Sequence, residues 1–320
     1  MTRVLVFEYL TGGGLIDGDT DGAAGDELMP MGRAMRDALV ADLLRIDGCS
    51  VSVAACERAP LAAGSARAVQ ACAGESVFDF VARQAAQHDL AWIVAPETGG
   101  LLAQFHGCVG ADRWLGCDRA AIELASSKGA TLRRLHDAGL PTPLGITPGA
   151  QPTRWVVKPD DGAGCVATRV HASHAAAQQD ARSRAEGPTT IEPWVEGEPL
   201  SISVLCSNAG AELLSVNRQR IGMSSDGQLT FNGVDVNVIP PTSERGAALS
   251  ALASRVARAV PGLHGFVGID LVWHPTRGPV VIELNPRVTC AYVGLSAALG
   301  RNLAADVVRA HTREWSDALV

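Results

Sequence analysis

The chain has 320 residues, 47% of them hydrophobic, which exceeds a typical single domain and predicts two or three lobes. Its net charge of -7, with no basic run interleaved with aromatic residues, argues against nucleic-acid binding. No stretch of about 18 apolar residues occurs, and the N-terminus does not resemble a signal peptide, so we expect a cytoplasmic protein without membrane association.

The first hundred residues alternate apolar strands with helices. We predict strands over residues 4–7, 50–54 and 90–95, and helices over 26–45 and 76–87. The first helix is indicated by an apolar face, formed by Leu28, Met31, Met35, Leu39 and Leu43. This alternation indicates an α/β lobe with a doubly wound parallel sheet, whose ligand edge lies at the carboxyl ends of the strands.

Two acids and a run of glycines lie at that edge. Glu8 and Glu97 each follow a predicted strand. Their carboxylates could bind a substrate ammonium group or accept hydrogen bonds from neighbouring backbone N–H groups, and the sequence leaves both readings open. The nearby turn lacks the GxGxxG pattern of a dinucleotide site. The candidate substrate residues of this lobe are Glu8, Gly12, Gly13, Gly14 and Glu97.

The next segment contains two lysines in different settings. Lys128 precedes a predicted helix that stops at Gly139, and taken alone it reads as an exposed helix residue. Lys158 lies inside the apolar strand 154–159, where a surface role is harder to assign. Gly162 and Gly164 follow that strand directly, so a flexible loop is expected next to Lys158.

Near the C-terminus, two predicted apolar strands carry side chains with polar oxygen atoms. The run 280–282 leads into Glu283 and Asn285, which share one face of an extended segment, and the strand 265–272 carries Asp270. Two carboxylates and an amide oxygen suit a hard cation such as Mg²⁺. The alternative is a strand-end glutamate bonded to a neighbouring arginine.

In this order, the features resemble the ATP-grasp superfamily over roughly residues 115–300, with the N-terminal lobe as its pre-ATP-grasp domain. The resemblance implies an ATP-grasp fold divided into residues 1–112, 113–188 and 189–320. It also implies that the protein uses ATP together with Mg²⁺ or Mn²⁺ and joins a carboxylate to an amine. One departure is Gly268, because the D-alanine–D-alanine ligase branch carries an arginine two residues before its metal-binding aspartate.

Residue roles follow from the same resemblance. Lys128 and Lys158 match the lysines that contact the nucleotide phosphates, and the Gly162–Gly164 loop matches the one that closes over them. The predicted metal ligands are Asp270, Glu283 and Asn285. The predicted adenine and ribose contacts are Glu192, Trp194, Val195 and Glu198. The predicted catalytic arginines are Arg287, which matches a residue that meets the acyl phosphate or substrate carboxylate, and Arg218 and Arg220, which could neutralise the γ-phosphate.

A narrower resemblance involves residues 6–9, 12–14 and 95–98, which look like the tyramine–glutamate ligase family of methanofuran biosynthesis. It implies joining the γ-carboxylate of glutamate to tyramine or a related amine, with ATP converted to ADP and phosphate. Two alternatives remain, a small-molecule carboxylate kinase and a non-catalytic ATP-binding regulatory protein. The intact acids at 270 and 283 speak against the last. The expected partners are small molecules, and a homodimer stays open.

Overall fold

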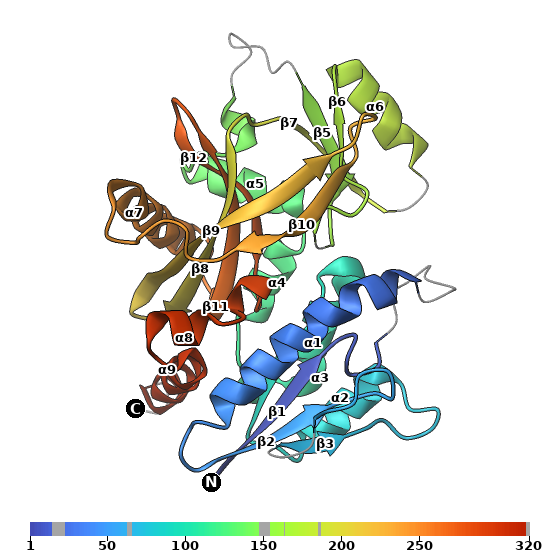
Figure 1. The fold of residues 1–320 in the computed structure, drawn as a ribbon, viewed down its shortest axis with the longest axis vertical. Helices are drawn as coiled ribbons and strands as arrows, with labels where there is room; N and C mark the ends of the chain where they lie inside the picture. Colours follow the sequence, from blue (N-terminus) through green and yellow to red (C-terminus); the bar gives the residue numbers. More distant parts are fainter. Residues whose placement is uncertain (15–22, 63–65, 147–153, 163, 185–186, 318–320) are drawn as a thin grey trace.

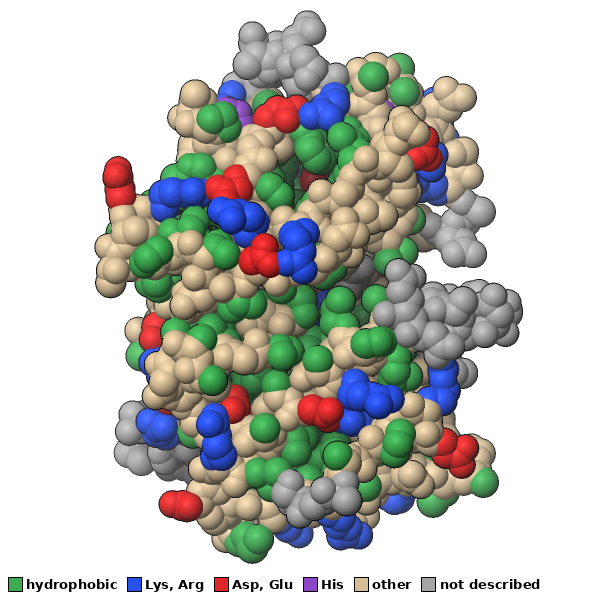
Figure 2. All heavy atoms as spheres, viewed as in Figure 1, with side chains coloured by type: hydrophobic (Ala, Val, Ile, Leu, Met, Phe, Trp, Pro, Cys, Tyr) green, Lys and Arg blue, Asp and Glu red, His purple; other side chains and the backbone are tan. Residues whose placement is uncertain are grey.

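A computed structural model of the protein describes residues 1–14, 23–62, 66–146, 154–162, 164–184 and 187–317. Within these ranges the chain forms a four-stranded, a three-stranded and a five-stranded sheet, each with its own helices (Figure 1). None of the described helices has the length and apolar character needed to cross a membrane. Acidic and basic side chains are interspersed over the face shown in Figure 2.

The N-terminal lobe is a parallel sheet with helices on both faces, which confirms the predicted doubly wound lobe. Its strand order is β3-β2-β1-β4, and every pairing is parallel. The strands are β1 (Thr2–Glu8), β2 (Cys49–Ala54), β3 (Arg67–Val69) and β4 (Leu90–Val94). Helix α1 (Ala23–Leu43) buries Leu39 against Val4 and Val6, whereas α2 (Val77–Ala85) and α3 (Leu101–Val109) pack with Phe7 on the other face.

Some details of this lobe differ from the prediction. Strand β3 and helix α3 were not expected, and α3 begins directly after Gly100. Helix α1 begins three residues earlier than predicted, and its apolar face is incomplete: Leu28 is 40% exposed, and Met29 occupies a buried position instead.

The large sheet is antiparallel, with the order β10-β9-β8-β11-β12. Its strands are β8 (Glu198–Ser207), β9 (Gly210–Met223), β10 (Leu229–Asp235), β11 (Gly265–His274) and β12 (Gly278–Asn285). Helix α7 (Glu244–Ala259) covers one face, where Leu249 packs with Ile202 and Leu271. Because side chains alternate across a strand, residues one position away point to the opposite face. That face carries the polar groups described below.

The small sheet joins β6-β5-β7 in antiparallel pairing. It consists of β5 (Trp155–Pro159), β6 (Arg169–His171) and β7 (Thr189–Pro193), flanked by α6 (His174–Ser183). A boundary between two subdomains was expected at residue 189. In the structure, residue 189 is the first residue of β7, which belongs to this sheet. Helices α4 (Arg119–Ala125) and α5 (Lys128–Asp137) precede it, and α5 packs beside β12. The short 3-10 helices are Thr98–Gly100, Ala111–Arg113, Pro143–Gly145 and Cys290–Tyr292.

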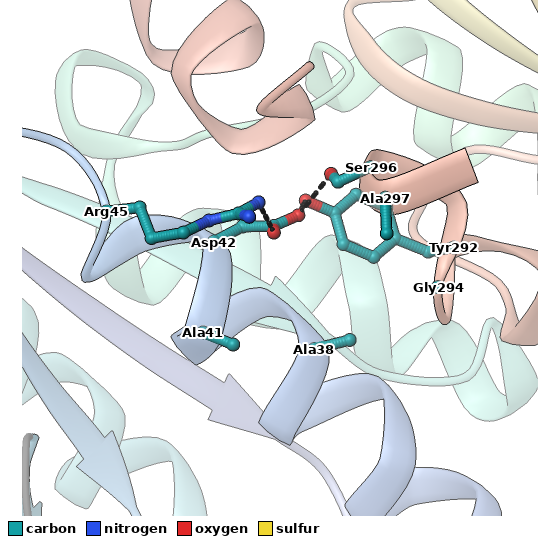
Figure 3. Close-up of a pocket in the computed structure, with 8 residues that line it drawn as sticks. All are labelled: Ala38, Ala41, Asp42, Arg45, Tyr292, Gly294, Ser296 and Ala297. Carbon is teal, nitrogen blue, oxygen red and sulfur yellow. Dashed lines mark hydrogen bonds and ion pairs between the residues drawn. The ribbon is translucent and has the colours of Figure 1, made fainter. Parts of the chain in front are cut away.

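The C-terminal helices connect the large sheet to the N-terminal lobe. Helices α8 (Leu295–Leu299) and α9 (Leu303–Asp317) follow the Cys290–Tyr292 turn, and both this turn and α9 contact α1. The buried carboxylate of Asp42 accepts hydrogen bonds from the Tyr292 hydroxyl at 2.8 Å and from Ser296 Oγ, beside a cavity of about 220 Å³ (Figure 3). Two segments 250 residues apart are thereby bonded together.

Candidate functional site

Lys158 is one of several predicted site residues that are buried in the structure. It lies on β5, and its Nζ donates to Glu192 Oε1 on β7 at 2.8 Å, with 5% and 3% of the two side chains exposed. Both residues project from one face of the small sheet, because Val156 pairs with Glu192 and Lys158 lies two positions further on. Burial alone would lower the pKa of Lys158, but the carboxylates of Glu192, Glu283 and Asp270 raise it.

Lys128 is also buried and reaches the same place from α5. Its Nζ lies 3.1 Å from Glu283 Oε1 and donates to the Gly162 carbonyl oxygen at 2.7 Å. Ser127 caps the helix by accepting the N–H of Ala130, which fixes Lys128 as the first helical residue. The reading of Lys128 as an exposed helix lysine is therefore excluded, since the side chain is only 6% exposed.

The predicted acids meet on the face of the large sheet opposite α7. Asp270 on β11 is paired directly with Glu283 on β12, and Gly268 with Asn285. Asn285 Nδ2 donates to Asp270 Oδ2 at 3.3 Å. Burial and the like charge of Glu283 raise the pKa of Asp270 to about 7. A carboxyl group in this position favours a cation nearby, because a positive charge stabilises its ionised form.

These residues fit Mg²⁺ and a nucleotide. The donor set is two carboxylates and an amide, the hard oxygen ligands that Mg²⁺ prefers, while no group of three or more His, Cys, Asp and Glu side chains suited to a metal occurs in the described ranges. In addition, Glu192 Oε2 is buried and accepts no hydrogen bond in the described structure. A buried acceptor without a donor is costly, so a ligand N–H group at this position would be stabilised.

The raised pKa of Asp270 makes the stability of the ligand-free protein depend on pH. A carboxyl group with a raised pKa holds its proton longer in the folded state than in the unfolded state, so stability falls as pH rises between about 4 and about 7. We expect a slope of up to about 1.4 kcal/mol per pH unit in this window. Chemical denaturation in EDTA should show this slope for the wild type, and Asp270→Asn should reduce it. An equal slope in the variant would contradict the assignment of this pH dependence to Asp270.

The residues described so far form one cluster, which consists of Lys128, Lys158, Glu192, Asp270, Glu283 and Asn285. Three other predicted residues face away from this cluster. Leu200 pairs with Arg218, so Glu198, Arg218 and Arg220 share the α7 face, whereas Ser201 pairs with Asp270 and Asn217 on the other. Glu198 accepts hydrogen bonds from Arg218 at 2.9 Å and from Arg245 of α7 at 2.7 Å.

The structure thus places these three residues away from the position that their expected roles require. Glu198 is engaged by two arginines on the helix-covered face, and Arg220 forms an ion pair with Asp235. The residue of β9 that reaches Asp270 is Gln219, which hydrogen-bonds to its carboxylate. Gln219 was missed. The alternation of side chains along β9 could have identified it, because Gln219 lies two positions after Asn217 and so on the same face of the strand.

Arg287 and Glu97, predicted as separate substrate contacts, bind each other. Arg287 Nε and Nη2 each donate to the Glu97 carboxylate at 2.9 Å, in a bidentate pair with 11% and 3% of the side chains exposed. The pair joins the end of β4 to the segment after β12. Arg287 also lies close enough to Glu283 and Asp270 for their charges to act on its pKa, which together with Glu97 they raise despite the effect of burial.

The N-terminal candidates around Glu8 have internal roles in the structure. The buried carboxylate of Glu8 accepts the backbone N–H of Thr11 at 2.9 Å and of Leu10 at 3.4 Å, which is the second of the two readings left open. The N–H groups of Gly12, Gly13 and Gly14 donate to the carbonyls of residues 8, 10 and 9. A Cβ at Gly12 would lie 2.5 Å from the Phe7 ring. Close packing accounts for the glycine there.

The glycine loop and the segment after β7 border the cluster. Gly162 has a φ of 98° and accepts the Lys128 contact through its carbonyl, and the neighbouring Asp161 accepts the N–H of Gly99 at 2.9 Å. Gly164 also has positive φ, while Ala163 lies outside the described residues. After β7, the N–H of Trp194 donates to the Arg154 carbonyl at 3.0 Å, and Val195 is buried.

Comparison with known families and structures gives a consistent result. The family described as ATP-grasp domain matches residues 125–291, more than half of the chain, and the family described as pre ATP-grasp 3 domain matches residues 49–122. No curated protein matches the sequence.

Similar solved structures cover nearly the whole chain. An ATP-grasp superfamily protein from Archaeoglobus fulgidus is 21% identical with a TM-score of 0.67, covering 96% of this chain and 88% of that one. D-alanine–D-alanine ligase from Bacillus anthracis complexed with ATP is 13% identical with a TM-score of 0.67, covering 99% and 100%. An L-amino acid ligase from Bacillus licheniformis is 14% identical with a TM-score of 0.62, covering 97% and 74%. At these identities the likeness concerns the fold.

Proposed function

The chain belongs to the ATP-grasp domain family, and on that premise we propose that it is an ATP-dependent carboxylate–amine ligase. The reaction would join a carboxylate to an amine and convert ATP to ADP and phosphate. The observation that carries this proposal is the convergence of two buried lysines on the carboxylates of Glu283 and Glu192, with Lys128 at 3.1 Å from Glu283 and Lys158 on Glu192 at 2.8 Å.

The charges of this cluster suit phosphoryl transfer to a carboxylate. A carboxylate is a poor electrophile. Its attack on the γ-phosphate releases ADP and gives an acyl phosphate, whose carbonyl carbon an amine can attack with release of phosphate. The approach of these anions requires nearby positive charge that is already in place. Lys128 and Lys158 would supply it, and Asp270, Glu283 and Asn285 would hold Mg²⁺, which supplies further charge when bound.

The bonded environment of the glycine loop supports exclusion of water. Lys128 holds the Gly162 carbonyl, and Asp161 holds the N–H of Gly99 in the N-terminal lobe, so the loop spans the boundary between the two parts of the chain. A covered acyl phosphate is protected from hydrolysis. Arg287 would meet this intermediate or the substrate carboxylate once it separates from Glu97.

The finer proposal is glutamate as the acid and tyramine, or a related arylethylamine, as the amine, in the synthesis of a methanofuran-type cofactor. It rests on the short resemblance at residues 6–9, 12–14 and 95–98. The internal bonding of Glu8 and of the glycine turn removes part of its support, whereas Glu97 keeps a carboxylate beside the cluster.

The test is ADP release measured with a panel of acids and amines, together with the masses of the products. We expect turnover to require Mg²⁺ or Mn²⁺ and both organic substrates, and to yield ADP and an amide. Glutamate with tyramine should stimulate ADP release more than D-alanine does.

Each deviation excludes a different part of the proposal. Formation of AMP and pyrophosphate would exclude the acyl-phosphate route. ADP release with an acid alone, accompanied by a phosphorylated product, would indicate a carboxylate kinase. Turnover with D-alanine but not with glutamate and tyramine would remove the finer proposal and leave the ligase.

A further inference from the structure

Asp160 is a carboxylate beside the proposed ATP site to which neither the sequence nor the mechanism above gives a role. It lies directly after β5, two residues beyond Lys158. Its Oδ2 accepts the Ser127 hydroxyl at 2.6 Å, and its Oδ1 accepts the N–H of Gly129 at 2.8 Å and the hydroxyl of Thr190. Its backbone carbonyl accepts the N–H of Lys128 at 2.8 Å.

These bonds involve residues on both sides of Lys128. Ser127 is the cap of α5 and Gly129 is its second residue, so Asp160 binds the backbone or side chain of three consecutive positions. Thr190 lies on β7 and is the strand partner of Lys158. One residue therefore joins the start of α5, which carries Lys128, to the two strands that carry Lys158 and Glu192.

The carboxylate of Asp160 lies close to Gly129 and is negatively charged. A Cβ at Gly129 would lie 3.0 Å from Asp160 Oδ1 and 3.4 Å from the Thr190 hydroxyl, so the absence of a side chain at 129 permits the approach. Burial tends to raise the pKa of Asp160, but the hydrogen bonds from Ser127, Thr190 and the Gly129 N–H lower it overall. The carboxylate is thus ionised at neutral pH and lies at the positive N-terminal end of α5.

We propose that Asp160 is a positioning residue that sets the separation of Lys128 and Lys158, so that both ammonium groups meet the phosphates of one nucleotide. The inference rests on the proposed ATP site. Positioning matters because a displacement of about 1 Å in such a site can cost on the order of 100-fold in rate. Lys128 and Lys158 belong to different elements, 30 residues apart, and the Asp160 side chain, which follows the strand of Lys158, bonds to the residues on either side of Lys128.

The test compares ATP with adenosine in wild type, Asp160→Ala, Lys128→Met and the double variant, with dissociation constants measured by displacement of a fluorescent nucleotide. We expect Asp160→Ala to weaken ATP binding about tenfold or more and adenosine binding less than about twofold, because only the phosphates meet the lysines. In the Lys128→Met background, Asp160→Ala should have less than about a twofold effect on ATP, since the residue it positions is already absent.

A structural role alone would give a different pattern. Equal losses for ATP and adenosine, or the same loss with and without Lys128, would overturn the proposal. Asp180→Ala is the matched control: Asp180 lies on α6, which flanks the small sheet, and is also bonded by a histidine and an arginine, so its removal should leave the ratio of the two affinities unchanged.

Milder substitutions keep the test decisive if Asp160→Ala unfolds. Asp160→Asn retains one acceptor oxygen and should recover most of the ATP affinity. Ser127→Ala removes the bond to Asp160 together with the cap bond to the Ala130 N–H, and should weaken ATP binding about threefold. ATP affinities unchanged in both would overturn the proposal. These are binding measurements, so a wild type that binds ATP but forms no amide would refute the ligase while leaving the role of Asp160 decided. A wild type that does not bind ATP would overturn both.

Discussion

Replacing Glu283 with glutamine is expected to lower ATP-dependent turnover about 100-fold or more. Glu283 contacts Lys128 at 3.1 Å and is the strand partner of Asp270, so its charge acts on both the cation and the lysine of the proposed site. Glutamine keeps the size and one acceptor oxygen, which leaves electrostatics as the main change. The measurement is the initial rate of ADP release over a range of Mg²⁺ concentrations.

The matched control for Glu283→Gln is Glu198→Gln. Both residues are half-buried glutamates of the same sheet, but Glu198 lies on the α7 face with Arg218 and Arg245. We expect its neutralisation to change turnover and the KM for ATP by less than about threefold, with some loss of thermal stability. Wild-type turnover in Glu283→Gln would remove that residue from the site. A raised KM for ATP in Glu198→Gln would instead restore the ribose role expected from the sequence.

Lys158→Met is expected to have the largest combined effect, on folding and on nucleotide binding. The ammonium group of Lys158 is the hydrogen-bonded partner of the buried Glu192, and it also offsets the charges of Asp270 and Glu283. Removing one partner of a buried ion pair leaves the other charge uncompensated, which costs about 3–5 kcal/mol. We expect this loss in chemical denaturation, together with a loss of detectable ATP binding.

Two further variants separate the two effects of Lys158→Met. Adding Glu192→Gln removes the unpaired charge and should recover much of the stability but not the ATP affinity. The exposed pair of Arg154 and Glu196 provides the control, because Arg154→Met should cost less than about 1 kcal/mol. ATP binding close to wild type in Lys158→Met would refute the proposed phosphate contact, whatever the change in stability.

The sequence predicted that Asp270 and Glu283 would lie together, because their pairing depends on local rules. Asp270 and Glu283 lie on consecutive antiparallel strands joined by a short turn, so their pairing follows from a hairpin and from the period of two along each strand. Lys158 was singled out because it lies within an apolar strand, and its expected contact with the nucleotide phosphates came from the resemblance to the ATP-grasp superfamily. The doubly wound lobe followed from the alternation of strands and helices.

The same period of two explains why the sequence did not place Glu198 and Arg218 on the α7 face. A single step along a strand reverses the face, and the sequence does not state which face of β8 or β9 meets Asp270. The pairing of Ser201 with Asp270 decides which face this is, and these two residues are 69 positions apart in the sequence. Glu198 was proposed from the resemblance to the ATP-grasp superfamily and Arg218 as a charge for the γ-phosphate, whereas Gln219, which is uncharged, faces the cluster.

Other contacts depend on the tertiary fold. Arg287 and Glu97 are 190 residues apart and come from different lobes, so each was predicted as a ligand of a substrate and neither as a ligand of the other. Asp160 was missed for a related reason: its partners lie on α5 and β7, which the chain separates by about 60 residues. Predictions from local pattern identify which residues carry charge, whereas their partners depend on how the lobes pack.

The pairing of Glu97 with Arg287 has a consequence for saturation with the acid substrate. If Arg287 binds that acid, Glu97 acts as a tethered competitor, and the acid can bind only in the fraction of molecules in which the pair is open. The apparent dissociation constant is the intrinsic one divided by that fraction, so an enzyme open one time in a hundred would bind its acid about 100-fold more weakly. The bidentate geometry thus sets a lower limit on the concentration of acid at which the proposed reaction would proceed at half its maximal rate.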